Sequence, residues 1–307
     1  MRKVFTIGET VFDLIFNKSQ KVNAKPGGAM LNSAVSLGRL GTPVSFISEI
    51  GDDNTGKYIL EFLTKNGVDT SFCDQFKDGQ TALALAFLDK NDNADYSFYK
   101  NYPNQRLTQK LPILNQEDIL LFGSFFAITR EVRKPLLEFI KQSQKQDAII
   151  IYDPNFRKPH LHELPEIKND ILENISYSSI VRGSDEDFKL IFNADNADES
   201  FQILKENRCP ILIYTSSNKA VEFRSEEFKF SLPVIPVKTI STIGAGDTFN
   251  AGIVYNLIKF GLRNKNLQDV KIETWKEIIK NAIQFGSFVC THYDNYITHD
   301  FVNQIRS

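Results

Sequence analysis

Short apolar runs alternate along this chain with segments of helical periodicity. Runs rich in Ile, Val and Phe predict strands at residues 44–47, 119–122, 148–152 and 211–214. The spacing of apolar positions predicts helices at residues 29–40, 56–66, 130–144 and 248–260. The runs at 119–122 and 148–151 are apolar throughout, which is typical of strands buried on both faces. The order predicts an α/β fold, in which helices cover both faces of a parallel sheet and ligands bind beyond the carboxyl ends of the strands.

Two segments near the start and the middle of the chain interrupt this rhythm. Residues 82–88 and 96–99 flank a polar turn at 89–94, a pattern that indicates a β-hairpin. Residues 12–25 likewise lack an obvious helical crossover. We expect the two segments to pair as a small separate sheet that lies over the site as a lid. A helical pattern near 275–290 closes the domain, and residues 300–307 are expected to form a short polar tail.

Residues 241–252 combine a small-residue turn with the start of an apolar helical pattern. Gly244 and Gly246 permit backbone conformations closed to other residues, and Ala245 leaves room for a ligand. The first N–H groups of the following helix have no helical partner and can bind an anion, while Asp247 is placed to accept a proton from an attacking hydroxyl. From these residues alone, a plain strand-to-helix turn capped by Asp247 fits equally well.

Two other phosphate-binding patterns fail on inspection. A dinucleotide fingerprint needs a third glycine where Phe249 stands. Residues 51–57 have the spacing of a P-loop, but Tyr58 follows Lys57 where Ser or Thr is needed, and Asp52 and Asp53 would repel a phosphate. We interpret that match as a coincidence.

Composition narrows the class of partner. The 307 residues suit one large α/β domain with an attachment, or two domains. A net charge of −2 without blocks of like charge argues against nucleic acid or an anionic membrane as partner, and favours a small molecule. Three scattered cysteines and four histidines show no disulfide or metal spacing, so no metal site is expected and the cysteines are interpreted as buried thiols. No apolar run has the length of a signal-peptide core or a membrane span, which predicts a cytoplasmic protein.

Several motifs in sequence order resemble those of the ribokinase-like (PfkB) carbohydrate kinases over nearly the whole chain. The motifs are Gly8-Glu9 followed by Asp13, Pro26-Gly27-Gly28-Ala29 with Asn32, Leu37-Gly38-Arg39-Leu40-Gly41, Gly51-Asp52-Asp53, Gly67-Val68-Asp69, Asp153-Pro154-Asn155-Phe156-Arg157 and Gly244-Ala245-Gly246-Asp247. The motif at residues 153–157, Asp-x-Asn-x-Arg, is typical of fructokinase-like and ketodeoxygluconate kinase-like members. The resemblance implies one kinase domain over residues 1–307, built as a three-layer ribokinase-like sandwich with a small β-sheet lid from about 12–25 and 81–100.

The resemblance also implies a catalytic mechanism. Asp247 would be the base that removes the proton of a primary sugar hydroxyl as it attacks the γ-phosphate of ATP. The amides of Ala245, Gly246 and Asp247, after the turn at Gly244, would form the anion hole, and Arg157 would offer a planar donor fork to phosphate or sugar. Mg²⁺ would be carried by the ATP phosphates, so no dense ligand cage is expected. From the residue alone, Arg157 fits a surface ion pair as well.

Further roles follow from the same resemblance. The substrate-binding residues would be Asp13, Gly27, Gly28, Asn32, Tyr99, Lys100 and Asn155. The nucleotide-binding residues would be Ser184, Asp187, Thr215, Ser217 and Asn281. Structural alternatives stay open for several of them: a solvated strand end for Asp13, a first-turn residue for Asn32, a turn-former for Asn155, and hairpin core or a dimer contact for Tyr99.

The chain departs from the family pattern at the nucleotide side. Ser241 stands where relatives have an Asp linked with a monovalent-cation site, and residues 291–296 replace a Gly-containing loop that completes it, which argues against potassium activation. Asp187 replaces a Glu, and Thr215-Ser216-Ser217 lacks the usual glycine. These departures predict weaker ATP binding or a different position of the adenine.

The function that we expect from this resemblance is an ATP-dependent sugar kinase. Lys100 would meet an anionic substrate as a point charge rather than a bidentate fork, which favours a neutral sugar, with fructose first. The alternatives are ketodeoxygluconate kinase, ribokinase and nucleoside kinase, and, from another class, a degenerate kinase that acts as a sugar or nucleotide sensor. A flat aromatic lid also predicts a homodimer through the lid.

Overall fold

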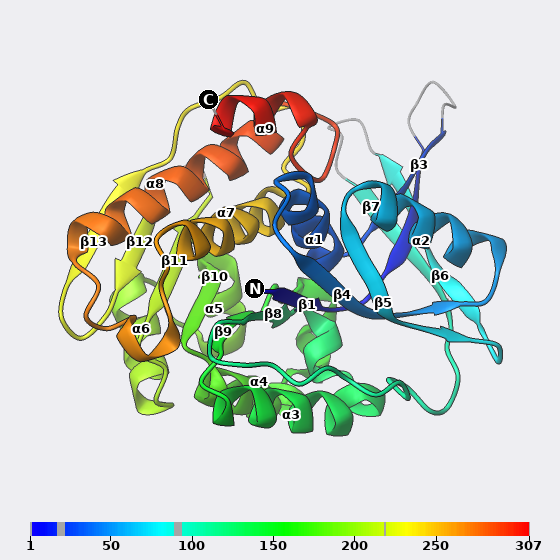
Figure 1. Cartoon of the computed structure of the whole chain (residues 1–307), viewed down its shortest axis with the longest axis horizontal. Helices are drawn as coiled ribbons and strands as arrows, with labels where there is room; N and C mark the ends of the chain where they lie inside the picture. The colour runs from blue at the N-terminus through cyan, green and yellow to red at the C-terminus, as the bar shows by residue number, and fades with distance from the viewer. Residues whose placement is uncertain (1, 17–21, 89–93, 218, 307) are drawn as a thin grey trace.

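The computed structural model describes residues 2–16, 22–88, 94–217 and 219–306, and its centre is a nine-stranded sheet (Figure 1). The strands of this sheet are β1 (Val4–Ile7), β4 (Val44–Gly51), β5 (Val68–Phe76), β8 (Ile119–Gly123), β9 (Ile149–Asp153), β10 (Ile180–Ser184), β11 (Leu212–Ser216), β12 (Ala220–Arg224) and β13 (Lys229–Pro233). Their order is β13-β12-β11-β10-β9-β8-β1-β4-β5, and only the β11-β12-β13 edge is antiparallel. This confirms the expected α/β fold with a mostly parallel sheet.

Helices lie on both faces of the sheet (Figure 1). The helices are α1 (Ala29–Arg39), α2 (Asn54–Lys65), α3 (Arg130–Lys145), α4 (Leu164–Tyr177), α5 (Asp185–Phe192), α6 (Ala197–Glu206), α7 (Ala245–Lys259), α8 (Ile272–Val289) and α9 (His299–Arg306). Short 3-10 turns occupy Phe125–Ile128, Lys158–Glu163 and Asn264–Asn266. Helices α1, α7 and α8 cover one face, and α3 and α4 cover the other, which makes three layers.

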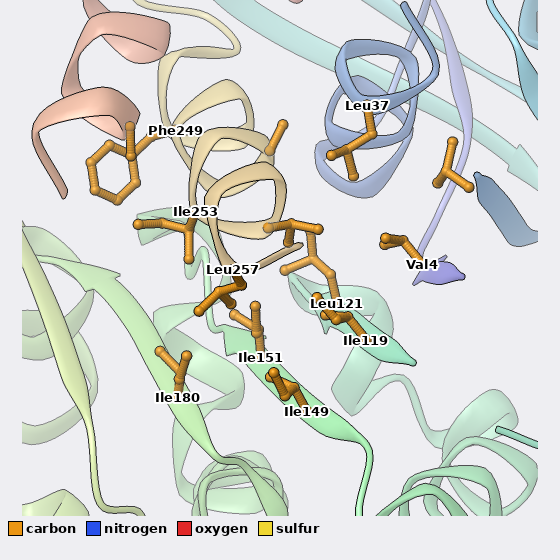
Figure 2. Close-up of a cluster of buried hydrophobic side chains, with 14 of the residues drawn as sticks. Val4, Leu37, Ile119, Leu121, Ile149, Ile151, Ile180, Phe249, Ile253 and Leu257 are labelled. Atoms are coloured by element: carbon orange, nitrogen blue, oxygen red, sulfur yellow. The ribbon is translucent and has the colours of Figure 1, made fainter. Parts of the chain in front are cut away.

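The two cores follow from the two-residue period of the strands. Val4 of β1, Ile119 of β8 and Ile149 of β9 pack with α1, α7 and α8, as Figure 2 shows for one part of this cluster. Their chain neighbours Phe5 and Leu120 point the other way and pack with α3, α4, α5 and α6. Because successive side chains alternate between faces, an uninterrupted apolar strand can serve both cores. The carboxyl ends of these strands therefore reach one edge as a rigid group.

A second, four-stranded sheet is formed by the two segments that interrupt the rhythm. Its order is β3-β2-β6-β7, with β2 (Val11–Phe16), β3 (Val22–Gly27), β6 (Gln80–Leu88) and β7 (Ala94–Asn101). The expected hairpin is confirmed by the antiparallel β6–β7 pairing. Most of its expected turn, residues 89–93, and residues 17–21 of the other segment lie outside the described residues. The small sheet is thus present as expected.

The segment with P-loop spacing joins the small sheet to the large one. Asp53 caps α2 by accepting from Gly56 N at 2.7 Å, and its carboxylate also accepts from Thr81 N at 2.8 Å and Thr81 Oγ1 at 2.9 Å. Thr81 lies in β6, so the same carboxylate holds the start of a small-sheet strand. The segment thus has a structural role, and the interpretation of the P-loop spacing as a coincidence stays a prediction.

The expected polar tail at 300–307 is wrong. Residues His299–Arg306 form α9, and Phe301 and Val302 are buried against Phe285 and Val289 of α8. The segment is short and mostly polar, so the apolar pair Phe301 and Val302 does not stand out in the sequence. A short helix with one apolar side becomes stable when that side packs against a core. Only the tertiary contact reveals it.

Candidate active site

Polar side chains gather where the parallel strands end. Asp153 ends β9, Ser184 ends β10, and Thr215 lies at the end of β11. The N-termini of α1 and α7 approach the same edge, because Asn32 of α1 and Asp247 of α7 are hydrogen bonded to each other. This edge is where open parallel sheets bind ligands.

The turn before α7 has the conformation that an anion-binding site needs. Gly244 caps the helix with φ 82°, and a Cβ there would lie 2.2 Å from the Asn295 carbonyl oxygen, so only glycine fits. The Ala245 N–H donates to the Thr242 carbonyl at 3.3 Å, whereas the amides of Gly246 and Asp247 belong to the first turn, which lacks helical acceptors. Of the three amides expected to bind the anion, these two remain available in full.

Asp247 is not the cap of α7, although the capping alternative fitted the sequence equally well. The cap is Gly244, and no side chain bonds to the end of the helix. The Asp247 carboxylate instead accepts from Asn32 Nδ2 at 2.8 Å, and Ser33 Oγ donates to the Asp247 carbonyl at 2.8 Å. Burial raises its pKa to about 6, a change opposed by the hydrogen bond from Asn32. A partly exposed carboxylate with this pKa is suited to accept a proton near neutral pH.

The N-terminus of α1 brings a second carboxylate to the site. Gly28 has φ 132° and a Cβ there would lie 2.3 Å from the Glu9 carbonyl, while a Cβ on Gly27 would lie 2.1 Å from Asp13 Oδ2. Gly27 therefore lets the Asp13 side chain of β2 approach the start of the helix, and Gly28 lets the Glu9 backbone approach it. Burial raises the pKa of Asp13 to about 6, and Lys25 opposes that change. Asn32 is buried, and its Oδ1 has no partner among the described residues, so it can accept from a ligand hydroxyl.

A buried network lies beneath α7 and includes two residues that sequence reasoning missed. Asp153 Oδ2 accepts from Arg182 Nη1 at 3.0 Å and from Asn250 Nδ2 at 2.6 Å. Asn155, with φ 38°, donates its N–H to Asp153 Oδ1 at 3.1 Å, so the turn-former alternative describes its backbone. Asn250 lies one turn after Asp247 on the same helix, and this spacing could have identified it as a site residue. Nothing in the sequence could have identified Arg182, because a single Arg in a strand is uninformative.

The residues expected around the nucleotide do not all lie together: some belong to the buried network, and others lie apart from it. Asp187 is buried and forms a capping box with Ser184, whose N and Oγ donate to Asp187 Oδ2 at 2.7 and 2.6 Å, while Phe156 N donates to its other oxygen at 2.6 Å. Burial, and next the charge of Asp153, raise the pKa of Asp187. Both of its oxygens are thus used within the protein. Thr215 accepts from Arg182 Nη2 at 2.9 Å.

The remaining nucleotide residues lie apart from this network. Ser217 is exposed at the end of β11, with φ 40°. Asn281 of α8 donates to Asn256 Oδ1 at 2.9 Å. Asn256 follows Asp247 by nine residues, about 13 Å along a helix axis. The structure therefore does not bring Asn281 to the first turn of α7, and its nucleotide role stays a prediction.

The hairpin residues Tyr99 and Lys100 lie on opposite faces of the small sheet. The register pairs Tyr99 with Leu83 and Leu83 with Phe12, so Tyr99 is on the face opposite Asp13. Lys100 Nζ pairs with Glu9 Oε1 at 2.7 Å, and Tyr102 OH donates to the same carboxylate at 2.7 Å. Glu9 thus neutralises the cation that was expected to meet a substrate. The substrate roles of both residues stay predictions.

The site fits an anion better than a directly bound metal. Arg157 is exposed beside the site and lowers the pKa of Asp247 through its charge. The buried atoms Asn32 Oδ1, Asn250 Oδ1 and Arg182 Nε have no hydrogen-bond partner in the described part of the chain. Within the described ranges, no group of three or more His, Cys, Asp or Glu is arranged to hold a metal ion. Phosphate oxygens, rather than protein carboxylates, would supply the ligands of a magnesium ion here.

Other expectations from composition have mixed outcomes. Cys73 and Cys209 are buried free thiols, but Cys290 is only half-buried, so that part of the interpretation is wrong. A search of the described helices finds none with the length and hydropathy to span a membrane.

Comparison with known proteins places these features in a family context. The sequence profile described as pfkB family carbohydrate kinase matches residues 1–298. A curated relative, Fructokinase-2 of Oryza sativa subsp. japonica, is 28% identical over 274 residues, which cover 87% of this chain and 79% of the relative.

Two solved structures share the fold. Aminoimidazole riboside kinase from Salmonella enterica, complexed with aminoimidazole riboside and an ATP analogue, superposes with a TM-score of 0.85 at 24% identity and covers 99% of this chain and 100% of its own. A double mutant of fructokinase from Vibrio cholerae O395, bound to fructose, ADP and a potassium ion, gives a TM-score of 0.86 at 21% identity, covering 99% and 98%.

Proposed function

Because the chain belongs to the pfkB family of carbohydrate kinases and is a phosphotransferase with a sugar alcohol as acceptor, we propose that it is an ATP-dependent fructokinase that phosphorylates a primary hydroxyl. The observation that carries the proposal is the position of Asp247. Its carboxylate lies in the first turn of α7, fixed by Asn32 and beside free amides. A base and an anion-binding turn in one place are the parts that phosphoryl transfer needs.

The residues divide the reaction between two helix ends. The N-terminus of α1 and Asp13 hold the sugar, with Asn32 Oδ1 accepting from a hydroxyl while its Nδ2 orients Asp247. Asp247 removes the proton of the attacking hydroxyl, and the amides of Gly246 and Asp247 receive the transferred phosphoryl group. Arg157 adds positive charge from the exposed side. Magnesium, held by phosphate oxygens, would neutralise charge on the transferred group.

A neutral sugar fits the small sheet better than an acidic one. A substrate carboxylate held by the small sheet would need an uncompensated cation there, but Glu9 pairs with Lys100 at 2.7 Å, and Glu49 pairs with Arg106 at 2.7 Å in a buried position. Separating either pair would leave a carboxylate without its partner, which is costly. Ketodeoxygluconate is therefore the less favoured acceptor. Fructose is favoured because the rice relative is a fructokinase.

The test is coupled ADP release with Mg-ATP against fructose, ribose, ketodeoxygluconate, glucose, adenosine and aminoimidazole riboside. We expect fructose to give the highest kcat/KM. Asp247→Asn is the matched variant, since it keeps the shape and removes the base; turnover should fall by about two to four orders of magnitude. Retention of near wild-type turnover would reject the mechanism, and preference for another acceptor would reject fructose.

The rival from another class is a degenerate kinase that senses a sugar or nucleotide. It predicts thermal stabilisation by sugar without ADP release. We also propose that the protein forms a homodimer through the small sheet, for which a test is given in the Discussion. The cytoplasmic location stays a prediction.

A further inference from the structure

Three polar side chains continue the apolar rows that face α7. Ile149 and Ile151 of β9, Ile180 of β10 and Ile213 of β11 pack in the core cluster beneath α7. With the two-residue period of a strand, Asp153, Arg182 and Thr215 extend those rows toward the strand ends. The sheet thus places a cation and a carboxylate directly under the first turn of α7.

The Arg182 guanidinium is fixed by two neighbouring strands. Nη1 donates to Asp153 Oδ2 at 3.0 Å, and Nη2 donates to Thr215 Oγ1 at 2.9 Å. The side chain is 11% exposed, and Asp153 is 1% exposed. A guanidinium held by two hydrogen bonds has a fixed position before any ligand binds.

The same guanidinium lies against the anion-binding turn. A Cβ on Gly246 would lie 2.9 Å from Arg182 Nη1 and 3.2 Å from Nη2. A side chain at this position would therefore displace the Arg182 guanidinium from its place. Arg182 Nε is buried and has no acceptor among the residues that the structure describes. The guanidinium therefore keeps one unused donor, and it lies close to Gly246, whose amide we assign to the transferred phosphoryl group.

We propose that Arg182 is a positioning residue of the transfer site, which holds Asp153 as a neutralised partner and supports the Gly246 amide and the ionised Asp247 from beneath. The proposal rests on the kinase function proposed above. Four side chains act on the Asp247 carboxylate. Asn32 of α1 donates a hydrogen bond to it, and Asp153 of β9, Arg157 of the following loop and Arg182 of β10 act through their charges. Asp153 raises the pKa of Asp247 and the two arginines lower it. Without Arg182, Asp153 would act on the base unopposed from below.

The variant Arg182→Gln tests this role, with Arg224→Gln as the matched control. Arg224 of β12 is equally buried at 10% exposure, and it pairs with Asp198 at 2.6 Å and Glu222 at 2.7 Å, but it contacts none of the site residues. We expect Arg182→Gln to lower kcat by about tenfold to hundredfold while the KM for sugar changes little. The acidic limb of its kcat/KM profile should move to higher pH. Arg224→Gln should lower only the melting temperature.

A readout that does not depend on turnover separates failure of this inference from failure of the proposed function. Carboxyl-carbon NMR titration follows the pKa of Asp247, whose signal is identified by its absence in Asp247→Asn. The pKa should rise in Arg182→Gln and not in Arg224→Gln. If the two variants have the same kcat and the same Asp247 pKa, Arg182 is only structural and the inference is overturned. A wild-type protein inactive on every acceptor would reject the proposed function, and the NMR titration alone would then decide this one.

Arg182→Lys keeps the test valid if Arg182→Gln does not fold. A lysine keeps the charge but cannot reach Asp153 and Thr215 with one fork. We expect it to retain the position of the acidic limb and to lose part of kcat. Wild-type kcat in this variant would overturn the positioning role, and a limb displaced to higher pH would overturn the electrostatic one.

Discussion

At the scale of single residues, the environment of Asp247 shows how a helix end becomes a reactive site. The carboxylate is three residues after the cap Gly244, so the helix does not use it as a cap. It is instead held by Asn32 of a helix far away in sequence, at 2.8 Å. Asn32 thus holds the base with its Nδ2, while its buried Oδ1 has no partner among the described residues. The substrate role that we propose for Asn32 uses this second atom.

The pKa of Asp247 predicts the acidic limb of the pH profile. The base must be ionised to accept a proton, and burial raises its pKa to about 6. We therefore expect kcat/KM for sugar to be constant above this pH and to fall by roughly tenfold or more per unit below it. The measurement is initial rate from pH 5 to 9 at saturating Mg-ATP. A limb near the pKa of a free carboxylate, or none, would contradict the prediction.

Asp13 offers an internal check on that profile. Its pKa is also raised to about 6 by burial, and under the proposed function it holds the sugar rather than the transferred phosphoryl group. Its titration should therefore affect KM, whereas that of Asp247 should also appear in kcat.

At the scale of elements, α9 shows how a polar segment acquires structure from its neighbour. Phe301 is 6% exposed, stacks at 4.3 Å between ring centroids on Phe288 and meets Phe285 edge-on at 5.1 Å. We expect Phe301→Ala to lower the free energy of unfolding by roughly 3 kcal/mol, because a large buried ring leaves a cavity. Chemical denaturation measures it. A control at exposed Asn303 on the same helix, Asn303→Ala, should have little effect; equal losses would show that α9 is not docked.

A strand of the small sheet is tied to the loop that adjoins the anion-binding turn. Lys25 Nζ of β3 donates to the Tyr293 carbonyl at 2.6 Å and to Asn295 Oδ1 at 2.8 Å. The Asn295 carbonyl in turn accepts from Thr248 Oγ1 at 3.3 Å. The loop oxygens thus already have a cation.

This contact predicts activity without potassium. Turnover should be the same in potassium chloride and in choline chloride at equal ionic strength, because the ammonium of Lys25 takes the loop oxygens that a metal cation would need. A strong stimulation of kcat by potassium would contradict the prediction. Lys25→Met is the informative variant, since it frees the oxygens; only there do we expect potassium to raise turnover.

At the scale of the whole molecule, the outer face of the small sheet is apolar. The register places Leu14 beside Leu85 and Phe16 beside Phe87 on the face opposite Asp13, and Phe16 and Phe87 stack at 4.9 Å. Phe87 is 47% exposed and Tyr99 is 59% exposed. Contiguous apolar surface of this kind marks interaction sites more often than free surface.

We expect two copies to pair through this face. The variant Leu85→Glu should convert a dimer into a monomer in sedimentation velocity, because a charge would be buried in the interface without a partner. Exposed Ile113, outside the small sheet, gives the control Ile113→Glu, which should leave the mass unchanged. A wild-type monomer at micromolar concentration would contradict the prediction.

Much of the fold can be predicted from the sequence, because the patterns that indicate its elements lie within short segments. The two-residue period of the strands and the apolar stripe of the helices predict the sheet and both cores, and glycines with positive φ at Gly28 and Gly244 stand where no other residue fits. The Ser184–Asp187 pair shows the same locality: its spacing is that of a capping box, and the structure uses it so. The residues of such motifs can be identified from the sequence because they lie close together in the chain.

Only the tertiary structure decided which distant side chains meet. Arg182 and Asp153, Asn32 and Asp247, and Lys25 and Asn295 are pairs separated by 29 to 270 residues in the chain. No periodicity encodes such contacts, because they depend on where each strand ends and on which of its faces a side chain lies. The docking of α9 and the neutralisation of Lys100 by Glu9 belong to the same class. The sequence determines the elements and the reactive turn, while the packing of those elements sets the charge around the base.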